Sequence, residues 1–569
     1  MSAENVGNET AVLSSAQALL AQGQVRAAAA MLRPLAKSVT GAHARLVAEL
    51  LIAARLLDDA VSLAIRVAIE QSEAWPWINN FAGHMRARGD LDASRRVVEA
   101  FIAAHPAPSV ERMHADITLA LGLPSAYRDM TELNETRDTY LCQLREFVSD
   151  YPPQTLHQIN ANADDLTRSN FFLAYQGGND LAAQSIYGDW LVESIAAVAR
   201  SSTPPPLAKN GQPTIAFISS KWHECTVGWY FAAWVKHLCR SWNVTLVHTP
   251  GARRDTLTVD LAATCRSEIM LSPTIESASE QIRALGACIV LYPELGTDGF
   301  TFALAAQRLA PVQACAWGHP VTSGLPTVDV FFTCAAMEPV DAEAHYRERL
   351  IGLPGIGTRY ESPSLPPAVS SLDIGLPGDV PLYLMPQALH KWHPDTDQLL
   401  VEIVRRDPSA RFVLFELRPP SPARIVNERL LSALGSVSQR PAEHLIWMPE
   451  CSRADYLRIN QACRVMVDTP HWSGGNASLD ALQCGLPIVT LPGRFMRGRQ
   501  SAGMLQLLGF EELIASSVEE LADIAVALAH DEVHRNSLSE QIRQRAASLT
   551  QSESPLLALE ASLRKLVSQ

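Results

Sequence analysis

The sequence predicts an all-α helical region followed by two α/β domains, each built on a parallel β-sheet. The first 123 residues are rich in Ala, Leu and Arg and carry almost no strand pattern, and residues 124–199 keep a helical pattern. From residue 211 onward, short apolar runs alternate with helical segments, as in Rossmann-like sheets covered by helices. A Pro-rich stretch at 361–379 interrupts this alternation once. We therefore expect domains at 1–200, 211–360 and 379–569.

Length and composition agree with this organisation. A chain of 569 residues exceeds the ~250–300 residues at which single cores stop growing. With 47% hydrophobic and 19% charged residues it can bury large cores. The formal net charge of -13 makes nonspecific attraction to nucleic acid or to an anionic membrane unexpected.

The cysteines and the N-terminus indicate a soluble cytoplasmic protein. The ten cysteines are scattered, without a CxxC pair or zinc spacing, so we expect reduced core residues. The opening MSAENVGNET has no basic segment followed by an apolar core, and we expect no signal peptide. The uncharged stretch 309–328 contains three prolines and two glycines, which makes it a poor membrane helix.

Three similar segments indicate helical repeats in the first region. They are LLAQGQVRAAAAML, LIAARLLDDAVSLA and GHMRARGDLDASRRV, and Ala27, Ala60 and Ala93 take the same place in each, 33 residues apart. Small residues at helix crossings with a period of about 34 are typical of tetratricopeptide repeats. The repeats are degenerate, and a plain helical bundle is the alternative. The sequence Ser201–Pro206 (SSTPPP) is expected to be a boundary linker.

Ten short apolar runs are the expected strands of the two sheets. They are Thr214–Ser219, Val244–His248, Cys288–Tyr292, Val312–Ala316, Val328–Thr333, Leu382–Met385, Arg411–Phe415, Leu445–Met448, Val465–Asp468 and Ile488–Leu491. Two such domains in tandem normally bind a ligand in the cleft between them, beyond the carboxyl ends of the strands. Helices are expected near 518–530 and 537–549 at the end of the chain.

The stretch 464–491, RVMVDTPHWSGGNASLDALQCGLPIVTL, reads as strand, turn, helix and strand. Ser473, Gly474 and Gly475 form the turn, and a helix follows. Free N–H groups and the positive end of a helix dipole attract phosphate, and paired glycines let an anion approach the backbone. Asp480 falls in the first turns of this helix, where it could accept a sugar hydroxyl. The alternative is an ordinary turn whose glycines only save space.

Polar loops follow several expected strands, namely 219–229, 292–300, 317–324 and 385–394. In the last of these, Lys391 stands just ahead of a helix that His393 and Pro394 would start. A lysine at this position can reach a diphosphate held by the helix that follows Gly475. The alternative is a solvated surface lysine.

Four pieces resemble glycosyltransferase family 41, which includes protein O-GlcNAc transferases, SPINDLY-type O-fucosyltransferases and bacterial adhesin N-glucosyltransferases. They are RLAPVQACAWGHPVTSG, HYRERLIGLPG, DTPHWSGGNASLDAL and GLPIVTLPGRFMRGRQ, all between residues 308 and 500. The resemblance covers roughly residues 213–550, and its strength lies in the order and spacing of the pieces. The YLRI and GHP pieces are closer to the adhesin enzymes, whereas DTP, TSG and TLPG are closer to the O-GlcNAc transferases.

This resemblance implies a GT-B fold and inverting transfer from a nucleoside-diphosphate sugar to a protein acceptor, with no metal. Carried over by position, it implies that Lys391 binds the diphosphate and that Asp480 holds the ribose hydroxyls. Tyr456, in the YLRI piece, would lie against the base. The implied donor site is completed by the turn and helix start and by the histidine of the GHP piece: Ser473, Gly474, Gly475, Asn476, Ala477 and His319.

The chain departs from the family at two positions. Cys225 stands where both subfamilies place a histidine after the first strand, and His223 lies two residues earlier. A neutral thiol is a poor general base, so His223 is the better local candidate. Gly475 stands where O-GlcNAc transferases carry a histidine, which leaves the donor sugar open.

The resulting hypothesis is a cytoplasmic protein glycosyltransferase that moves GlcNAc or a hexose from a UDP-sugar to Ser or Thr, with GDP-fucose as the competing donor. Helical repeats would gather the acceptor protein. The alternatives are an Asn-directed N-glucosyltransferase of adhesin type and a repeat scaffold with a degenerate transferase domain. The oligomeric state and the acceptor protein stay open.

Overall fold

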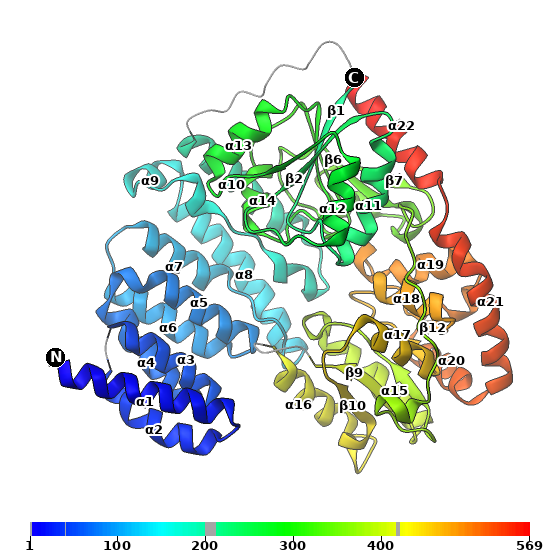
Figure 1. The fold of residues 1–569 in the computed structure, drawn as a ribbon, viewed down its shortest axis with the longest axis horizontal. Helices are drawn as coiled ribbons and strands as arrows, with labels where there is room; N and C mark the ends of the chain where they lie inside the picture. Colours follow the sequence, from blue (N-terminus) through cyan, green and yellow to red (C-terminus); the bar gives the residue numbers. More distant parts are fainter. Residues whose placement is uncertain (1–2, 40, 200–211, 417–420, 569) are drawn as a thin grey trace. The chain divides into compact units, whose positions relative to one another are not determined.

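The computed structural model describes residues 3–39, 41–199, 212–416 and 421–568, and it is drawn in Figure 1. The expected linker Ser201–Pro206 lies outside the described residues. The chain divides into two compact units, of which the first comprises Met1–Ser125 and the second begins at Ala126. None of the helices within these described ranges is long and apolar enough to cross a membrane.

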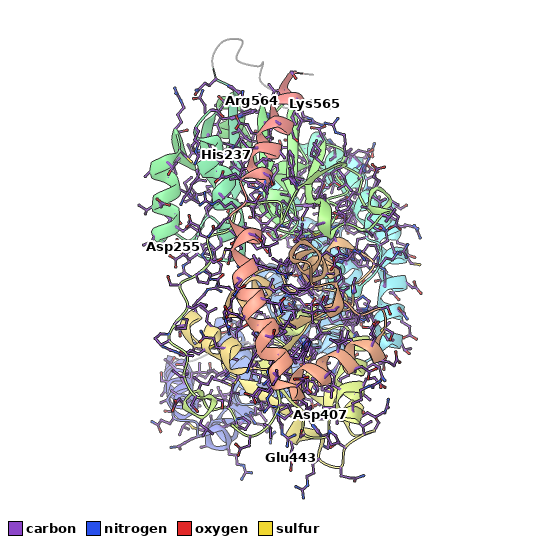
Figure 2. The ribbon with its side chains drawn as sticks, turned by 90° about the vertical axis from the view of Figure 1, so that its right-hand side faces the viewer. His237, Asp255, Asp407, Glu443, Arg564 and Lys565 are labelled. Atoms are coloured by element: carbon purple, nitrogen blue, oxygen red, sulfur yellow. The ribbon has the colours of Figure 1, made fainter. Side chains whose placement is uncertain are left out.

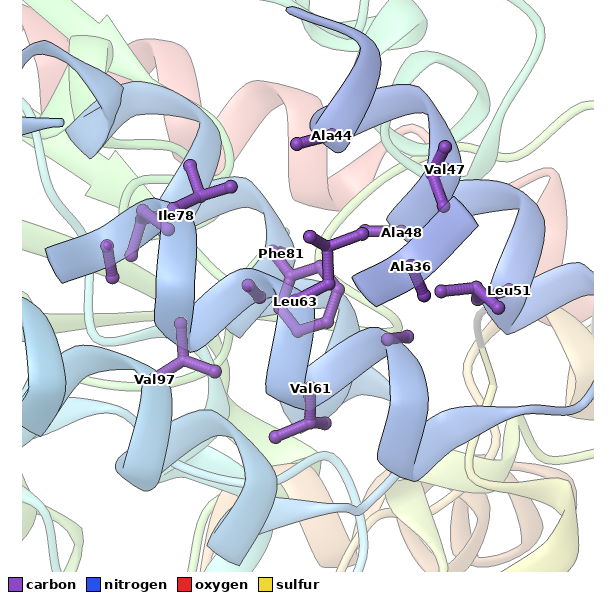
Figure 3. Packing of buried hydrophobic residues seen from close by; sticks show 14 of the residues in the cluster. Ala36, Ala44, Val47, Ala48, Leu51, Val61, Leu63, Ile78, Phe81 and Val97 are labelled. Atoms are coloured by element: carbon purple, nitrogen blue, oxygen red, sulfur yellow. The ribbon is translucent and has the colours of Figure 1, made fainter. Parts of the chain in front are cut away.

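The first unit consists of antiparallel helix pairs joined by tight turns. Helices α1 and α2, α3 and α4, and α5 and α6 pack as pairs. The helices are α1 Ala3–Ala21, α2 Val25–Ser38, α3 Gly41–Ala53, α4 Leu57–Glu70, the 3-10 turn η1 Ser72–Ala74, α5 Trp75–Ala87, α6 Leu91–Ala104 and α7 Val110–Leu121. Leu51, Leu63, Ile78 and Phe81 meet in one apolar core between these pairs (Figure 3).

The repeat spacing read from the sequence needs a correction of one residue in two of the three repeats. The buried small residues of the second helices are Ala28, Ala60 and Ser94, whereas Ala27 is exposed and Ala93 is only partly buried. Each pair turns through a residue of positive φ, at Gly23, Arg55 and Gly89. Arg55 adopts this conformation without being glycine, because the turn fixes its backbone, and the loss of glycine there makes the repeats degenerate.

The second unit opens with further helices that lead to the first sheet. They are α8 Met130–Asp150, α9 Pro153–Gln158, η2 Ala163–Leu166, η3 Phe171–Gln176 and α10 Leu181–Val198. These elements pack with one another, and η2 also contacts two helices that cover the first sheet; the contact pattern divides the chain after Ser125. The expected domain limits 1–200, 211–360 and 379–569 stay a proposal, and this division would move the first limit.

The first sheet has seven parallel strands in the order β3-β2-β1-β4-β5-β6-β7. The strands are β1 Thr214–Ser219, β2 Asn243–His248, β3 Ser267–Met270, β4 Ile289–Tyr292, β5 Val312–Ala316, β6 Val330–Cys334 and β7 Arg349–Leu353, and the helices are α11 Thr226–Leu238, α12 Thr256–Thr264, α13 Ile275–Ala284 and α14 Gly299–Ala305, with the turns η4 Ala335–Met337 and η5 Ala342–His345. Strand β3 and strand β7 were not expected. Both are partly exposed edge strands. The four residues of β3, SEIM, give little apolar signal, whereas β7, RLIGL, is mostly apolar and was overlooked.

The second sheet has five parallel strands in the order β10-β9-β8-β11-β12. All five were expected: β8 Leu382–Leu384, β9 Arg411–Phe415, β10 Leu445–Met448, β11 Val465–Val467 and β12 Ile488–Val489. The surrounding helices and turns are η6 Ser371–Ile374, η7 Leu389–Lys391, η8 Pro394–Thr396, α15 Asp397–Arg406, α16 Ala423–Leu434, η9 Pro441–His444, α17 Arg453–Ala462, α18 Asn476–Cys484, η10 Met496–Gly498, α19 Gln500–Leu508, η11 Glu511–Leu513, α20 Val518–His530 and α21 Glu532–Thr550.

The last helix, α22 Ser554–Ser568, returns to the first sheet and contacts α11 and β7 (Figure 1). Glu560 of α22 accepts hydrogen bonds from the Ser241 hydroxyl, at 2.6 Å, and pairs with His237 Nε2 at 2.9 Å. Figure 2 shows His237 of α11 beside the end of α22 that carries Arg564. The chain thus passes from the first sheet domain to the second and then returns to the first. Helix α22 would therefore belong to the proposed domain 211–360 and not to 379–569.

Candidate active site

The turn between β11 and α18 is held by a buried carboxylate at the end of the strand. Asp468 accepts hydrogen bonds from the Ser473 hydroxyl at 2.6 Å, the Gly474 amide at 2.8 Å and the Thr490 hydroxyl at 2.9 Å. A Cβ on Gly474 would meet the Ser478 hydroxyl at 2.2 Å, so the turn requires glycine. This arrangement presents the first N–H groups of α18, which have no acceptor within the helix, to the space beyond the sheet.

Lys391 reaches the same place from the loop after β8. Its Nζ lies 5.4 Å from the centre of the Trp472 ring. Burial lowers the pKa of Lys391 to about 8, although the charge of Asp468 acts in the opposite direction. The lysine is therefore a partly desolvated cation, and the expectation of a solvated surface residue does not fit it.

A pocket of about 260 Å³ lies between the two sheets at this point. Its lining from the first domain is Thr226, Val227, Tyr230, Phe231, Trp317, Gly318 and Pro320, and its lining from the second is Pro386, Gln387, Ala388, Lys391, Trp472, Gly475, Asn476, Ala477 and Gln500.

Three helices begin at this pocket. Thr226, Asn476 and Gln500 are the first residues of α11, α18 and α19, and all three line the pocket. The N-terminal end of each helix carries partial positive charge, and Lys391 adds a full charge when it is protonated. The arrangement is suited to an anion with several oxygens, such as a diphosphate.

Asp480 of α18 and Tyr456 of α17 are not among the residues that line the pocket. Both oxygens of Asp480 accept from Arg453, at 2.9 and 2.6 Å, and the guanidinium lies over Trp229, 4.5 Å from the ring centre. Burial raises the pKa of Asp480 to about 6, and Arg453 opposes this shift. The rings of Tyr456 and Phe415 lie 5.6 Å apart, and burial first, then the charge of Asp480, raise the pKa of Tyr456. The two residues are thus neighbours, and their roles toward ribose and base stay predictions.

His319 is buried beside two residues that line the pocket, Gly318 and Pro320. Its ring stacks on Phe171 of η3 at 5.5 Å. Burial first, and the charges of Arg497 and Lys391 next, lower the pKa of His319 to about 3, so the ring is neutral. Gly296 has φ +102 and a Cβ there would lie 2.9 Å from the His319 ring, so this loop also requires glycine.

Neither His223 nor Cys225 is among the residues that line the pocket, although the neighbouring Thr226 is. Cys225 caps α11, its Sγ lies 3.5 Å from the carbonyl oxygen of Lys221, and burial raises its pKa. Burial lowers the pKa of His223, and its Nδ1 has no partner among the described residues. Both features are compatible with the expectation that Cys225 is not the base.

Several site residues were not anticipated from the sequence. Tyr230, Gln387, Trp472 and Gln500 line the pocket, and Asp468 shapes its turn. Asp468 had a usable signal, because it directly follows an apolar strand. The aromatic residues had none, because they read as core positions of a helix or loop.

Glu294 is a further buried acid near this edge of the first sheet, and it accepts from the Ser219 hydroxyl. Burial raises its pKa to about 8, so it is largely neutral at pH 7. It does not line the pocket, and the Ser219 contact gives it a structural role at the ends of β1 and β4.

Within the described ranges, one group of side chains has the donor set of a metal site: His393, Asp395 and His471. The two histidine rings lie 3.8 Å apart, and each approaches a different oxygen of Asp395, at 2.6 Å. The carboxylate thus already holds both imidazoles, and the group ties the loop of Lys391 to the loop of Trp472. These contacts account for its geometry as a structural clamp.

The two sheets with a pocket between them, preceded by paired helices, define a glycosyltransferase architecture of the GT-B type. A solved structure of a mutant O-GlcNAc transferase from Thermobaculum terrenum superposes with a TM-score of 0.65 at 21% identity, and covers 100% of this chain and 98% of that chain. The predicted fold class is therefore confirmed.

Residues 355–560 match the model of glycosyl transferase family 41. The curated relatives include "Probable UDP-N-acetylglucosamine–peptide N-acetylglucosaminyltransferase SEC" of Arabidopsis thaliana, 26% identical over 257 residues, covering 43% of this chain and 26% of the relative. The UDP-glucose:protein N-beta-glucosyltransferase of Actinobacillus pleuropneumoniae is 27% identical over 261 residues, covering 45% of this chain and 40% of the relative. The chain thus spans less than half of these relatives, and its resemblance to family 41 is confirmed.

Proposed function

We propose that the protein is an inverting glycosyltransferase that moves GlcNAc or a hexose from a UDP-sugar to Ser or Thr of a protein acceptor. The observation that carries this proposal is the convergence of Lys391 and the starts of α11, α18 and α19 on one pocket between the sheets. These groups supply the positive charge that a departing diphosphate needs, and such electrostatic help is usually the largest part of catalysis. The transfer then needs no metal ion and no permanently bound cofactor.

In this proposal the donor lies across the second sheet domain. Lys391 and the N–H groups of Gly475, Asn476 and Ala477 bind the diphosphate, supported by the Ser473–Gly474 turn. Asp480 accepts from the ribose hydroxyls and Tyr456 lies against the base, while His319 bounds the pocket. The acceptor hydroxyl attacks the anomeric carbon in line with the departing diphosphate, and its proton passes to a base for which His223 is the local candidate.

The helical repeats are proposed to gather the acceptor protein, because repeat solenoids present extended surfaces for binding. We propose a cytoplasmic location, the one expected for a chain whose ten cysteines are scattered without CxxC pairs. We propose no nucleic acid or membrane partner.

An Asn-directed N-glucosyltransferase is the second candidate. It is favoured by the match to the Actinobacillus pleuropneumoniae glucosyltransferase and by the GHP and YLRI pieces. Intact-mass analysis of acceptor peptides with Ser and Thr, or with Asn alone, separates the two candidates.

A degenerate scaffold is the third candidate, and Cys225 is its only support. Titration calorimetry of the full chain with UDP and with GDP tests the proposed function most directly. Micromolar binding of UDP supports the proposed function, and a preference for GDP would mean that GDP-fucose is the donor. Binding of neither nucleotide would leave the degenerate scaffold as the remaining candidate.

A further inference from the structure

Four side chains that line the pocket carry polar atoms without a hydrogen-bond partner among the described residues. They are the Tyr230 hydroxyl, Trp317 Nε1, Gln387 Nε2 and both amide atoms of Asn476. Leaving a buried polar group unpaired costs roughly 1–3 kcal/mol, so natural structures seldom do it without a reason. Because all four residues line one pocket, a bound ligand is the simplest source of their missing partners.

Tyr230 is the most fully buried of the pocket's hydroxyl groups, with 4% of the residue exposed. Its ring packs edge-on against Trp317 at 6.5 Å and lies 5.5 Å from Tyr360. Its backbone is fixed as well, since the Thr358 hydroxyl donates to the Tyr230 carbonyl at 2.8 Å. The hydroxyl therefore has a defined position, which packing from the first domain determines.

That position faces the start of α18 in the second domain. A Cβ placed on Gly475 would lie 3.4 Å from the Tyr230 hydroxyl and 3.1 Å from Gln500 Oε1. Gly475 has no side chain, so the polar group at this point of the pocket is the Tyr230 hydroxyl of the first sheet domain. An anion oxygen held by the first N–H groups of α18 would be within hydrogen-bond reach of this hydroxyl.

The chemistry of the surroundings decides what the hydroxyl does. Burial raises the pKa of Tyr230 well above 10, so the group keeps its proton and can donate. Lys391 and the N–H groups of α18 are donors too. A ligand oxygen that accepts, and best one with negative charge, fits these three kinds of donor.

We propose that Tyr230 donates a hydrogen bond to the β-phosphate of the nucleotide donor, and so closes the diphosphate site from the first domain. This inference rests on the proposed function. When the bond between the anomeric carbon and the β-phosphate oxygen breaks, the electron pair stays on that oxygen. The Tyr230 proton is not transferred, and its hydrogen bond strengthens as charge collects on the phosphate.

The test compares Tyr230→Phe with wild type in the full chain. Titration calorimetry is done with UDP and UMP, and with GDP and GMP, because only the diphosphates carry a β-phosphate. We expect Tyr230→Phe to weaken diphosphate binding about tenfold or more, as for a hydrogen bond to a charged group, and to leave monophosphate binding within twofold.

Tyr292→Phe is the matched control. Tyr292 is also buried, and its hydroxyl has no partner in the part of the chain that the structure describes, but it does not line the pocket, so its variant should bind di- and monophosphates as wild type does. Removing an unpaired buried hydroxyl should leave the thermal unfolding temperature of Tyr230→Phe unchanged or higher, which keeps a loss of binding separate from a loss of folding.

Three outcomes overturn the inference. Unchanged diphosphate binding by Tyr230→Phe, or an equal loss for di- and monophosphate, overturns it and leaves the proposed function standing. A wild-type chain that binds neither UDP nor GDP overturns the proposed function and this inference together.

Discussion

Arg453 donates to both carboxylate oxygens of Asp480, at 2.9 and 2.6 Å, while Trp229 of α11 supports its guanidinium from the first domain. The Asp480 side chain is 1% exposed, and that of Arg453 is 33% exposed. The acid is therefore oriented by a partner that itself reaches across the cleft. A ribose hydroxyl that binds Asp480 would meet a carboxylate that is already fixed in place.

Nucleotide binding should weaken as the pH falls through about 6. Burial raises the Asp480 pKa to about 6, so the group is ionised at pH 7 and protonated at pH 5. A protonated Asp480 pairs less well with Arg453 and accepts less well from ribose. His319 and His390, whose pKa values burial lowers to about 3, do not titrate in this range. Calorimetric titration with UDP from pH 5 to 8 measures the effect.

The pH dependence of folding stability that Asp480 causes has the opposite sign to that of nucleotide binding, so the two effects can be told apart. The pKa of Asp480 is raised above its ordinary 3.8 in the folded chain. Its contribution to the free energy of unfolding is thus fully present below about pH 3.8 and is lost as the pH rises toward 6. Asp480→Asn should bind weakly at every pH, and exposed Asp523→Asn should keep the wild-type profile. A wild-type profile in Asp480→Asn would contradict the assignment.

Donor binding should need residues 126–200 and not residues 1–125. Tyr175 of η3 packs on Trp472 at 4.4 Å and on His390 at 4.8 Å, and Arg497 donates to Asp180 at 3.1 Å. A chain that starts at Ala126 keeps these contacts, so it should bind UDP as the full chain does and transfer poorly to protein acceptors.

The second truncation for comparison starts near Lys209. None of the donor-site residues expected from the sequence lies before Ser201, so the sequence alone predicts that this shorter chain keeps its nucleotide affinity. The structure gives a reason to expect the opposite, because removing η3 exposes Trp472 and leaves Arg497 without Asp180. Equal UDP affinity of the two truncations, with both folded by circular dichroism, would show that η3 does not support the pocket.

Cys225→Ala should keep most of the transfer rate, whereas His223→Ala should lower it. Burial raises the Cys225 pKa, so the thiol stays protonated at neutral pH and cannot take a proton from a hydroxyl. The lowered pKa of His223 keeps the imidazole neutral, which is the form a base requires. Transfer rates at saturating donor and acceptor decide between them. Full activity of His223→Ala with loss in Cys225→Ala would reverse the assignment.

The sequence predicted the parts of the fold that carry a strong apolar pattern. Each of the five strands of the second sheet lies in a run of apolar residues, which predicted it. The turn at Gly474 was predicted from its paired glycines. The edge strand Ser267–Met270 could not be found in this way, because exposed faces tolerate polar residues, whereas Arg349–Leu353 is mostly apolar and was overlooked. Helix α22 was also missed, although its buried leucines Leu556, Leu559 and Leu563 recur at helical spacing; its packing on α11 is a long-range contact that the sequence does not show.

The site shows the same division. Lys391, Gly475, Asn476 and Ala477 were predicted and line one pocket, because strand ends and helix starts meet at one edge of a parallel sheet. The pairing of Arg453 with Asp480 depends on how α17 packs on α18, and the meeting of Tyr230 with Gly475 depends on how helices of the two sheet domains approach each other. Local sequence pattern does not encode that approach.

Lys391→Ala should lower kcat as well as kcat/KM, by about 10²-fold or more, as when one group is removed from an anion-stabilising site. The donor carries its charge before the reaction, so the lysine contributes to binding. As the glycosidic bond breaks, charge collects on the β-phosphate and its contribution grows. Because burial lowers the Lys391 pKa to about 8, kcat/KM should also fall above about pH 8, where the free enzyme loses this proton.

Lys391→Arg and Lys565→Ala complete the test. Arginine keeps the charge and cannot lose its proton, so Lys391→Arg should recover only part of the rate, since a planar fork places its charge differently, and should lack the fall above pH 8. Lys565 is exposed on α22 and does not line the pocket, so Lys565→Ala should match wild type. The decisive measurement is the transfer rate at saturating donor. An unchanged kcat in Lys391→Ala would mean that the diphosphate lies elsewhere, because no other lysine lines the pocket that the structure describes.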